Sequence, residues 1–256
     1  MRLHVHEWGP NDGLPVVCLH GVTSHGRRFR ALAESFLADR RVVAFDLRGH
    51  GRSGYEPPWD LDTHAADALE TAAALGIERA DWIGHSFGGK VVAEIAARRP
   101  EAMRSATMLD PALSLPPAVC LERAELERGD ESFASVEELI EARLAEGVLF
   151  FTPRAYLEQE MADHLVARED GRLGYRYCKS AAIVAWSEMA TDAPPVGDVP
   201  TLMLIGELSW LPLEPHAERY RAALGDRFRA VTVRGGHTIL WDAFEQAGEE
   251  IRGFLA

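Results

Sequence analysis

Residues 80–90 read ADWIGHSFGGK and contain the pattern Gly-x-Ser-x-Gly, from Gly84 to Gly88. Residues 80–83 predict a short strand, and the residues from Ser86 to about Arg98 predict a helix. A sharp strand-to-helix turn holds its serine in a strained backbone conformation, with the hydroxyl clear of the sheet and beside free helix N–H groups. Ser86 is therefore a candidate nucleophile. The alternative is a glycine-rich turn with an incidental serine.

Strand and helix patterns alternate on both sides of this turn. Alternation of apolar and polar residues predicts a strand at residues 3–8, and further strands are predicted at residues 15–19, 41–45, 104–109, 201–205 and 228–233. Helical spacing of apolar residues predicts helices at residues 27–39, 63–75, 86–98, 215–224 and 242–254. Strands that alternate with helices of this length pair in parallel, so we expect an α/β fold with a mostly parallel central sheet and helices on both faces.

One stretch, residues 112–197, breaks this alternation. It contains no convincing strand but several helical segments, and Pro-Pro pairs stand near its two ends at Pro116-Pro117 and Pro194-Pro195. We therefore expect a helical insertion between two strands of the sheet. The predicted domains are a core of residues 1–111 and 198–256 and an inserted helical domain of residues 112–197.

The composition limits the classes of function. The chain has 256 residues, is 47% hydrophobic and carries a formal net charge of −13, which is typical of a globular protein with an acidic surface. Such a surface repels nucleic-acid phosphates and anionic lipids, so we expect neither as a partner. The three cysteines, Cys18, Cys120 and Cys178, have no metal-site spacing. No signal peptide or membrane span is apparent, and a cytoplasmic location is expected.

Two further glycine-containing segments lie where strands end. His20-Gly21-Val22 follows the strand at residues 15–19, and Gly235-Gly236-His237 follows the strand at residues 228–233. A nucleophilic serine needs a base that is active near neutral pH, and histidine is the usual one. We therefore predict that His237 is the base. The N–H groups of Val22 and Phe87 are the candidate donors of an oxyanion hole.

These segments resemble the successive signatures of the α/β-hydrolase family. They are His20-Gly21, residues 46–53 (DLRGHGRS), residues 84–89 (GHSFGG) and Gly236-His237. The resemblance covers nearly the whole chain except the insertion, which lies where that family places its cap domain. It implies an α/β-hydrolase core with a helical cap and a serine nucleophile, and it is poorly specific for substrate. It also implies that the family's first edge strand is missing, because the chain begins close to its first predicted strand.

The acid that should orient His237 is the difficult member of the predicted triad. The family usually places it shortly after the strand at residues 201–205, as G-x-x-D or with slightly longer spacing. Here that loop reads GELSWL, residues 206–211, and contains no aspartate.

Two carboxylates compete for this role. Asp110, within Leu109-Asp110-Pro111-Ala112, ends the preceding strand and resembles the acid-bearing Leu-Asp-Pro-Ala segment of pancreatic-type lipases. Glu207 lies on the usual loop, one residue after its glycine. We prefer Asp110, keep Glu207 as the alternative and place Glu214 third. A helix cap or a turn with Pro111 would be a purely structural role for Asp110.

The expected reaction is hydrolysis of a carboxylic ester or related acyl bond through an acyl-enzyme on Ser86. We expect a small hydrophobic acyl or aryl substrate, no cofactor, and a pocket lined by His20, Gly21, Trp186 and Trp210. The alternatives on the same scaffold are a C–C bond hydrolase, an acyl transferase, a perhydrolase or a lyase. A ligand-binding receptor with little turnover also remains open.

His4 and His6 share one face of the first strand and could bind a metal. An exposed edge pair without a metal is the preferred interpretation, so no metal ligand is assigned. The sequence gives no indication of the oligomeric state.

Overall fold

The computed structural model describes the backbone of residues 1–256 and the side chains of residues 1–161 and 163–256. Its centre is a seven-stranded sheet in the order β1-β3-β2-β4-β5-β8-β9. The strands are β1 (His4–Trp8), β2 (Pro15–Leu19), β3 (Arg41–Asp46), β4 (Ala80–His85), β5 (Met103–Leu109), β8 (Thr201–Gly206) and β9 (Phe228–Val233). Only β1 pairs antiparallel, with β3, among these described strands. The predicted α/β fold class is confirmed.

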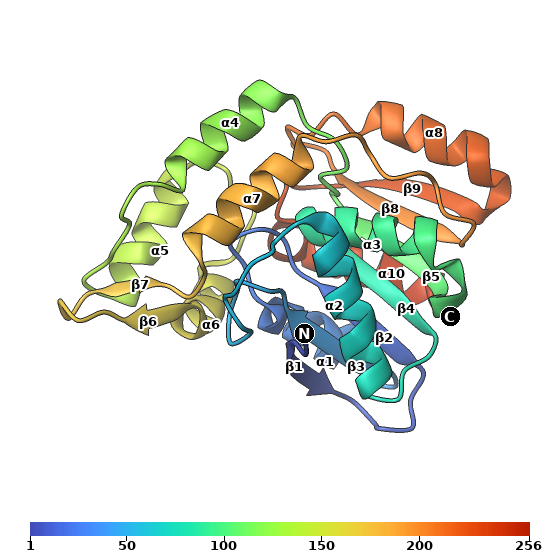
Figure 1. Cartoon of the computed structure of the whole chain (residues 1–256), viewed down its shortest axis with the longest axis horizontal. Coiled ribbons are helices and arrows are strands. Elements are labelled where there is room, and N and C mark those ends of the chain that lie inside the picture. Colours follow the sequence, from blue (N-terminus) through green and yellow to red (C-terminus); the bar gives the residue numbers. More distant parts are fainter.

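Helices cover both faces of this sheet (Figure 1). The core helices are α1 (Arg30–Phe36), α2 (Leu61–Ala74), α3 (Phe87–Arg98), α8 (Glu214–Leu224), α9 (Ile239–Asp242) and α10 (Phe244–Phe254). One buried apolar cluster joins the sheet to α2, α3 and α8, through residues such as Ala68, Val91 and Tyr220. A second cluster joins it to α1, α9 and α10, through Leu32 and Ile251 among others. The sheet is therefore the middle of three layers.

The insertion between β5 and β8 forms the lobe on the left of Figure 1. It contains α4 (Pro117–Leu126), α5 (Val136–Ala145), α6 (Arg154–His164) and α7 (Lys179–Met189). It also contains a two-stranded antiparallel sheet of β6 (Leu165–Ala167) and β7 (Leu173–Tyr175). The expectation that this stretch has no strand is therefore wrong. Each strand has only three residues, which is too short for an alternating pattern to be recognised in the sequence.

Local sequence determines where several helices begin. The Asp60 side chain accepts a hydrogen bond from the Thr63 N–H (2.8 Å) and caps α2. Ser135 caps α5 in the same way, through the Glu138 N–H (3.1 Å). The helix expected at residues 242–254 is instead split at Ala243, whose backbone angles are not helical (φ −130°, ψ 38°).

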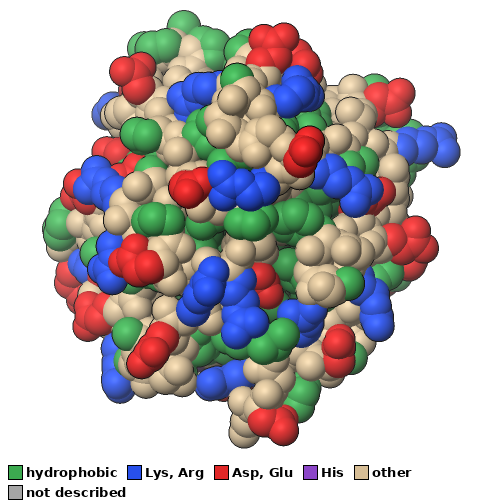
Figure 2. Space-filling model, turned by 90° about the vertical axis from the view of Figure 1, so that its right-hand side faces the viewer, with side chains coloured by type: hydrophobic (Ala, Val, Ile, Leu, Met, Phe, Trp, Pro, Cys, Tyr) green, Lys and Arg blue, Asp and Glu red, His purple; other side chains and the backbone are tan. Residues whose placement is uncertain are grey.

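The surface opposite the insertion is electrostatically mixed. Figure 2 shows basic and acidic side chains interspersed with apolar ones on the face formed by the right-hand side of Figure 1. Within the described residues, no helix has both the length and the apolar character needed to cross a bilayer.

Candidate active site

Ser86 lies in the turn between β4 and α3. Its backbone has a positive φ (53°, with ψ −116°), which non-glycine residues rarely adopt. The Ser86 N–H donates a hydrogen bond to the Leu109 carbonyl of β5 (3.0 Å), which fixes the turn against the neighbouring strand. A Cβ atom at Gly88 would lie 2.3 Å from the Leu19 carbonyl oxygen. The second glycine of the Gly-x-Ser-x-Gly pattern is therefore required for α3 to start against β2.

His237 lies on the loop after β9, within hydrogen-bonding distance of Ser86. Its Nε2 atom is 2.9 Å from Ser86 Oγ. Two contacts hold the loop: the Gly236 N–H donates to Asp242 Oδ2 (2.8 Å), and His85 Nε2 donates to the His237 carbonyl (2.9 Å). Burial places the pKa of His85 well below its ordinary value, so this ring is a neutral donor. His85 therefore helps to position His237.

Asp110 follows β5 and lies on the opposite side of the His237 ring. Its Oδ2 atom is 2.7 Å from His237 Nδ1, and its side chain is fully buried. The Gly206 N–H donates to Oδ1 (3.0 Å), and the Ser209 hydroxyl donates to Oδ2 (2.5 Å). Asp110 also has a positive φ of 43°. Ser86, His237 and Asp110 thus form one continuous line of hydrogen bonds.

The other two candidate acids lie outside this line. Glu207 is exposed, and its backbone N–H donates to the Val233 carbonyl (2.9 Å). Glu214 is an exposed residue at the start of α8. Asp110, and not Glu207, contacts His237, and the buried face of the Glu207 loop presents Gly206 and Ser209 to the carboxylate of Asp110.

Ser209 is a candidate site residue that the sequence reasoning missed. Residues 206–209 read Gly-Glu-Leu-Ser, so Ser209 occupies the fourth position of the G-x-x-D spacing that the family resemblance implies. Its hydroxyl contacts the carboxylate that β5 supplies. The available signal was a short polar side chain at the position where an acid was expected.

The loop after β2 lies directly beside Ser86. A Cβ atom at Gly21 would be 3.0 Å from Ser86 Cβ. Thr23 has a positive φ of 57°, and both of its backbone polar groups bind buried histidines. Its N–H donates to His50 Nε2 (3.2 Å), and its carbonyl accepts from His164 Nε2 of the insertion (2.8 Å). This loop carries Val22, and Phe87 begins α3 on the other side of Ser86.

The residues expected to line the pocket lie in three different environments: beside His237, against the core, and buried at the start of the loop after β2. Trp210 is 43% exposed, with its ring centroid 6.2 Å from that of His237. Trp186 of α7 packs against the core cluster that includes Phe87. His20 is corrected: it is fully buried and both of its ring nitrogens bind backbone groups, Leu47 N–H (2.9 Å) and Gly21 carbonyl (2.7 Å). It therefore positions the loop and has no ring nitrogen left for a ligand.

One cluster of possible metal ligands lies outside this line of hydrogen bonds. The ligand atoms of His4, His6 and Asp46 lie within 4.8 Å of one another. These residues belong to β1 and β3.

Comparison with known proteins gives the family. A family model described as alpha/beta hydrolase fold matches residues 15–130. The lipase LipV of Mycobacterium tuberculosis is 35% identical over 203 residues, which cover 78% of this chain and 77% of that protein. A non-heme chloroperoxidase of Streptomyces lividans is 45% identical over 94 residues, or 36% of this chain and 34% of that protein.

A solved structure supports the same fold over the full length. The crystal structure of E-2-(acetamidomethylene)succinate hydrolase matches with a TM-score of 0.87 and 23% identity, covering 99% of this chain and 94% of that chain. At this identity the match concerns the fold. Together with the extended similarity to LipV, the strand order and the Gly-x-Ser-x-Gly turn, it leads to one assignment. The chain belongs to the α/β-hydrolase family and is a hydrolase.

Proposed function

We propose that this protein hydrolyses carboxylic esters through an acyl-enzyme on Ser86. The observation that carries the proposal is the line of hydrogen bonds from Ser86 Oγ to His237 Nε2 (2.9 Å) and from His237 Nδ1 to Asp110 Oδ2 (2.7 Å). A nucleophile, a base and an acid in this arrangement perform acyl transfer on several unrelated folds. Ester hydrolysis is also in keeping with the lipase named among its relatives.

Each group has one role in the proposed reaction. His237 Nε2 accepts the Ser86 proton while Oγ attacks the ester carbonyl, and the imidazolium then donates that proton to the departing alcohol. Asp110 holds the ring orientation and stabilises its positive charge. Water, deprotonated by His237, attacks the acyl-enzyme, and the carboxylic acid leaves as Ser86 regains its proton. The N–H groups of Val22 and Phe87 stabilise the oxyanion in both steps.

Backbone strain supports the same residues. The described non-glycine residues with positive φ are Thr23, Ser86 and Asp110. Each such conformation costs about 1–3 kcal/mol and persists only where the surrounding structure enforces it. Thr23 lies in the loop of residues 20–23 that carries Val22 (the oxyanion loop), Ser86 lies in the nucleophile turn, and Asp110 is the acid. This clustering is expected where strain serves to position reacting groups.

We further propose that the substrate carries a small to medium apolar acyl or aryl group. Trp210 beside His237 is the aromatic surface that supports this proposal, and Trp186 of the insertion packs against the main core cluster. Apolar binding surface next to a few placed polar groups is the usual composition of a small-molecule site.

The test uses p-nitrophenyl esters of increasing acyl length and a fluorophosphonate probe. We expect turnover and stoichiometric labelling with the wild type, and loss of both with Ser86→Ala. Ser24→Ala is the matched control, because Ser24 is a buried serine that directly follows Thr23 in the loop after β2. This variant should keep most of the wild-type activity. Labelling of the Ser86→Ala variant at the wild-type rate would contradict the proposal.

A further inference from the structure

His4, His6 and Asp46 are brought together by the pairing of two strands. His4 pairs directly with Asp46 in the antiparallel register of β1 and β3, and His6 lies two residues further along β1. Because side chains alternate between the two faces of a strand, all three side chains point to the same face of the sheet. The sequence shows the His-x-His pair, but only the fold adds the carboxylate.

The spacing of these groups is suitable for a transition metal. His6 Nε2 lies 3.1 Å from Asp46 Oδ1, close to the separation of about 3.3 Å between two ligands of a tetrahedral Zn²⁺ with bonds near 2.0 Å. The His4 ring meets the His6 ring edge-on with centroids 4.8 Å apart, and the three ligand atoms lie within 4.8 Å of one another. A change of the His4 rotamer brings its ring nitrogen closer to the ligand atoms of His6 and Asp46.

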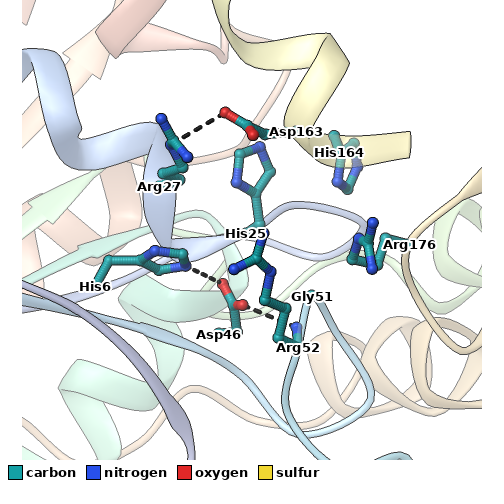
Figure 3. A pocket seen from close by; sticks show the side chains of 9 residues that line it. All are labelled: His6, His25, Arg27, Asp46, Gly51, Arg52, Asp163, His164 and Arg176. Atoms are coloured by element: carbon teal, nitrogen blue, oxygen red, sulfur yellow. Dashed lines mark hydrogen bonds and ion pairs between the residues drawn. The ribbon is translucent and has the colours of Figure 1, made fainter. Parts of the chain in front are cut away.

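The surroundings fix the carboxylate of Asp46, and His6 and Asp46 border a pocket. Asp46 is held by the N–H groups of Gly26 (2.7 Å) and Arg52 (2.9 Å), so the ligand oxygen is already oriented. In Figure 3, His6 and Asp46 point toward each other at the edge of a pocket that His25 and Arg27 also line. Arg27 is paired with Asp163 (3.0 Å), and Arg52 binds Asp46 through its backbone while its side chain is exposed.

We propose that His4, His6 and Asp46 form a binding site for a divalent transition metal of the Zn²⁺ class. Two imidazoles and one carboxylate prefer Zn²⁺ and its neighbours over Mg²⁺ or Ca²⁺, which select oxygen ligands. Three protein ligands leave a fourth position for water on the pocket side. The metal ties the edge strand β1 to β3, and through Asp46 to Gly26, which follows the oxyanion loop. This site is independent of the proposed esterase chemistry.

The test is calorimetric titration of EDTA-treated full-length protein with Zn²⁺, followed by thermal unfolding with and without the metal. We expect one site per chain and a higher unfolding midpoint with Zn²⁺. His4→Gln and His6→Gln should each weaken binding about tenfold or more and remove the shift in midpoint. His216→Gln on α8 is the matched control and should bind as the wild type does. Asp46 is left unchanged because it also holds two backbone N–H groups.

Two further readings separate metal binding from unrelated effects. Co²⁺ bound to the wild type should give the visible absorption of a tetrahedral site, and this absorption should be lost in the His4→Gln/His6→Gln double variant. The metal-free double variant should keep wild-type ester turnover. Equal Zn²⁺ affinity of the wild type and the double variant would overturn the proposal, whatever the outcome for Ser86.

Discussion

The carboxylate that contacts His237 belongs to Asp110, which directly follows β5. The family usually places this acid on the loop after β8. The buried position of Asp110 and its 2.7 Å contact with His237 Nδ1 lead to a direct prediction. Asp110→Asn should lower kcat roughly 10³–10⁴-fold, because the amide favours the wrong tautomer and cannot stabilise the imidazolium. Glu207→Gln should change kcat by less than about twofold. Steady-state kinetics on one ester compare the two variants, and a larger loss in Glu207→Gln would reverse the assignment.

The position of Ser209 allows a test in which the acid is moved from residue 110 to residue 209. Its hydroxyl is 2.5 Å from Asp110 Oδ2, which is itself 2.7 Å from His237 Nδ1. An aspartate side chain is one atom longer than serine, so a carboxylate at residue 209 can replace the one at residue 110. We expect the double variant Asp110→Ser/Ser209→Asp to be at least about tenfold more active than Asp110→Ser alone. The single variant Ser209→Asp should not exceed the wild type, because it places two carboxylates together. Equal activities of the double variant and Asp110→Ser would show that residue 209 cannot supply the acid.

At the residue scale, local sequence patterns identified side chains that the fold brings together. The turn around Ser86 and the glycine loop before His237 carry their own signals, and the structure has their side chains 2.9 Å apart. The choice between Asp110 and Glu207 depended on which strand end faces the histidine, and that is determined by the order of strands in the sheet. His20 was misjudged for a related reason. Its position beside Ser86 is evident from sequence, but the direction of its ring is determined by the Leu47 N–H.

At the scale of elements, the side chain of His164 connects the insertion to the proposed oxyanion loop. His164, the last residue of α6, donates from Nε2 to the Thr23 carbonyl (2.8 Å). We predict that His164→Leu lowers kcat about tenfold with little change in KM, because the displaced loop N–H groups act mainly in the transition state. His164→Gln keeps a donor and should recover part of kcat. Equal losses in the two variants would indicate a packing role instead of a hydrogen bond.

The element boundaries show what local sequence can and cannot predict. Strands β2 and β9 agree with their expected ranges. The sequence of β2, PVVCL, is a compact apolar run that ends before a glycine-containing loop. The β6–β7 hairpin was missed because its strands have three residues each and pair largely with one another. The break at Ala243 was missed because Asp242 uses its side chain to bind the N–H groups of Phe150, Phe151 and Gly236. These contacts come from segments distant in the sequence.

At the scale of the whole molecule, parallel pairing assembles the site. The carboxyl ends of β2, β4, β5 and β9 carry Val22, Ser86, Asp110 and His237, in line with the rule that open α/β sheets place their sites at this edge. The alternation of strands and helices predicted this edge from sequence. The sequence could not give the shape of the lobe above it, because packing between the insertion and the core involves contacts at long sequence separation.

The buried histidines give the whole molecule a predictable response to acid. Burial lowers the pKa of His50 to about 4 and those of His64 and His164 to about 3. It also places the pKa values of His20, His25 and His85 well below the ordinary value. These six rings stay neutral in the folded protein while the unfolded chain binds protons below about pH 6.5. Each such ring therefore costs up to about 1.4 kcal/mol of unfolding free energy per pH unit as the pH falls.

Glu160 acts in the opposite direction but cannot balance six histidines. Burial raises its pKa to about 7, so the folded protein takes up this one proton before the unfolded chain does. We therefore expect the free energy of unfolding, measured with urea, to be several kcal/mol lower at pH 5.5 than at pH 7.5. His64→Leu should reduce this difference by about the contribution of one of the six rings. The substitution breaks no hydrogen bond, because both ring nitrogens of His64 lack a partner among the described residues. Its ring packs edge-on against Phe87, with centroids 5.2 Å apart, so an apolar side chain fits that environment. Constant or rising stability toward pH 5.5 would mean that the six rings are protonated in the folded state. Protonated His50 could then no longer accept the hydrogen bond from the Thr23 N–H.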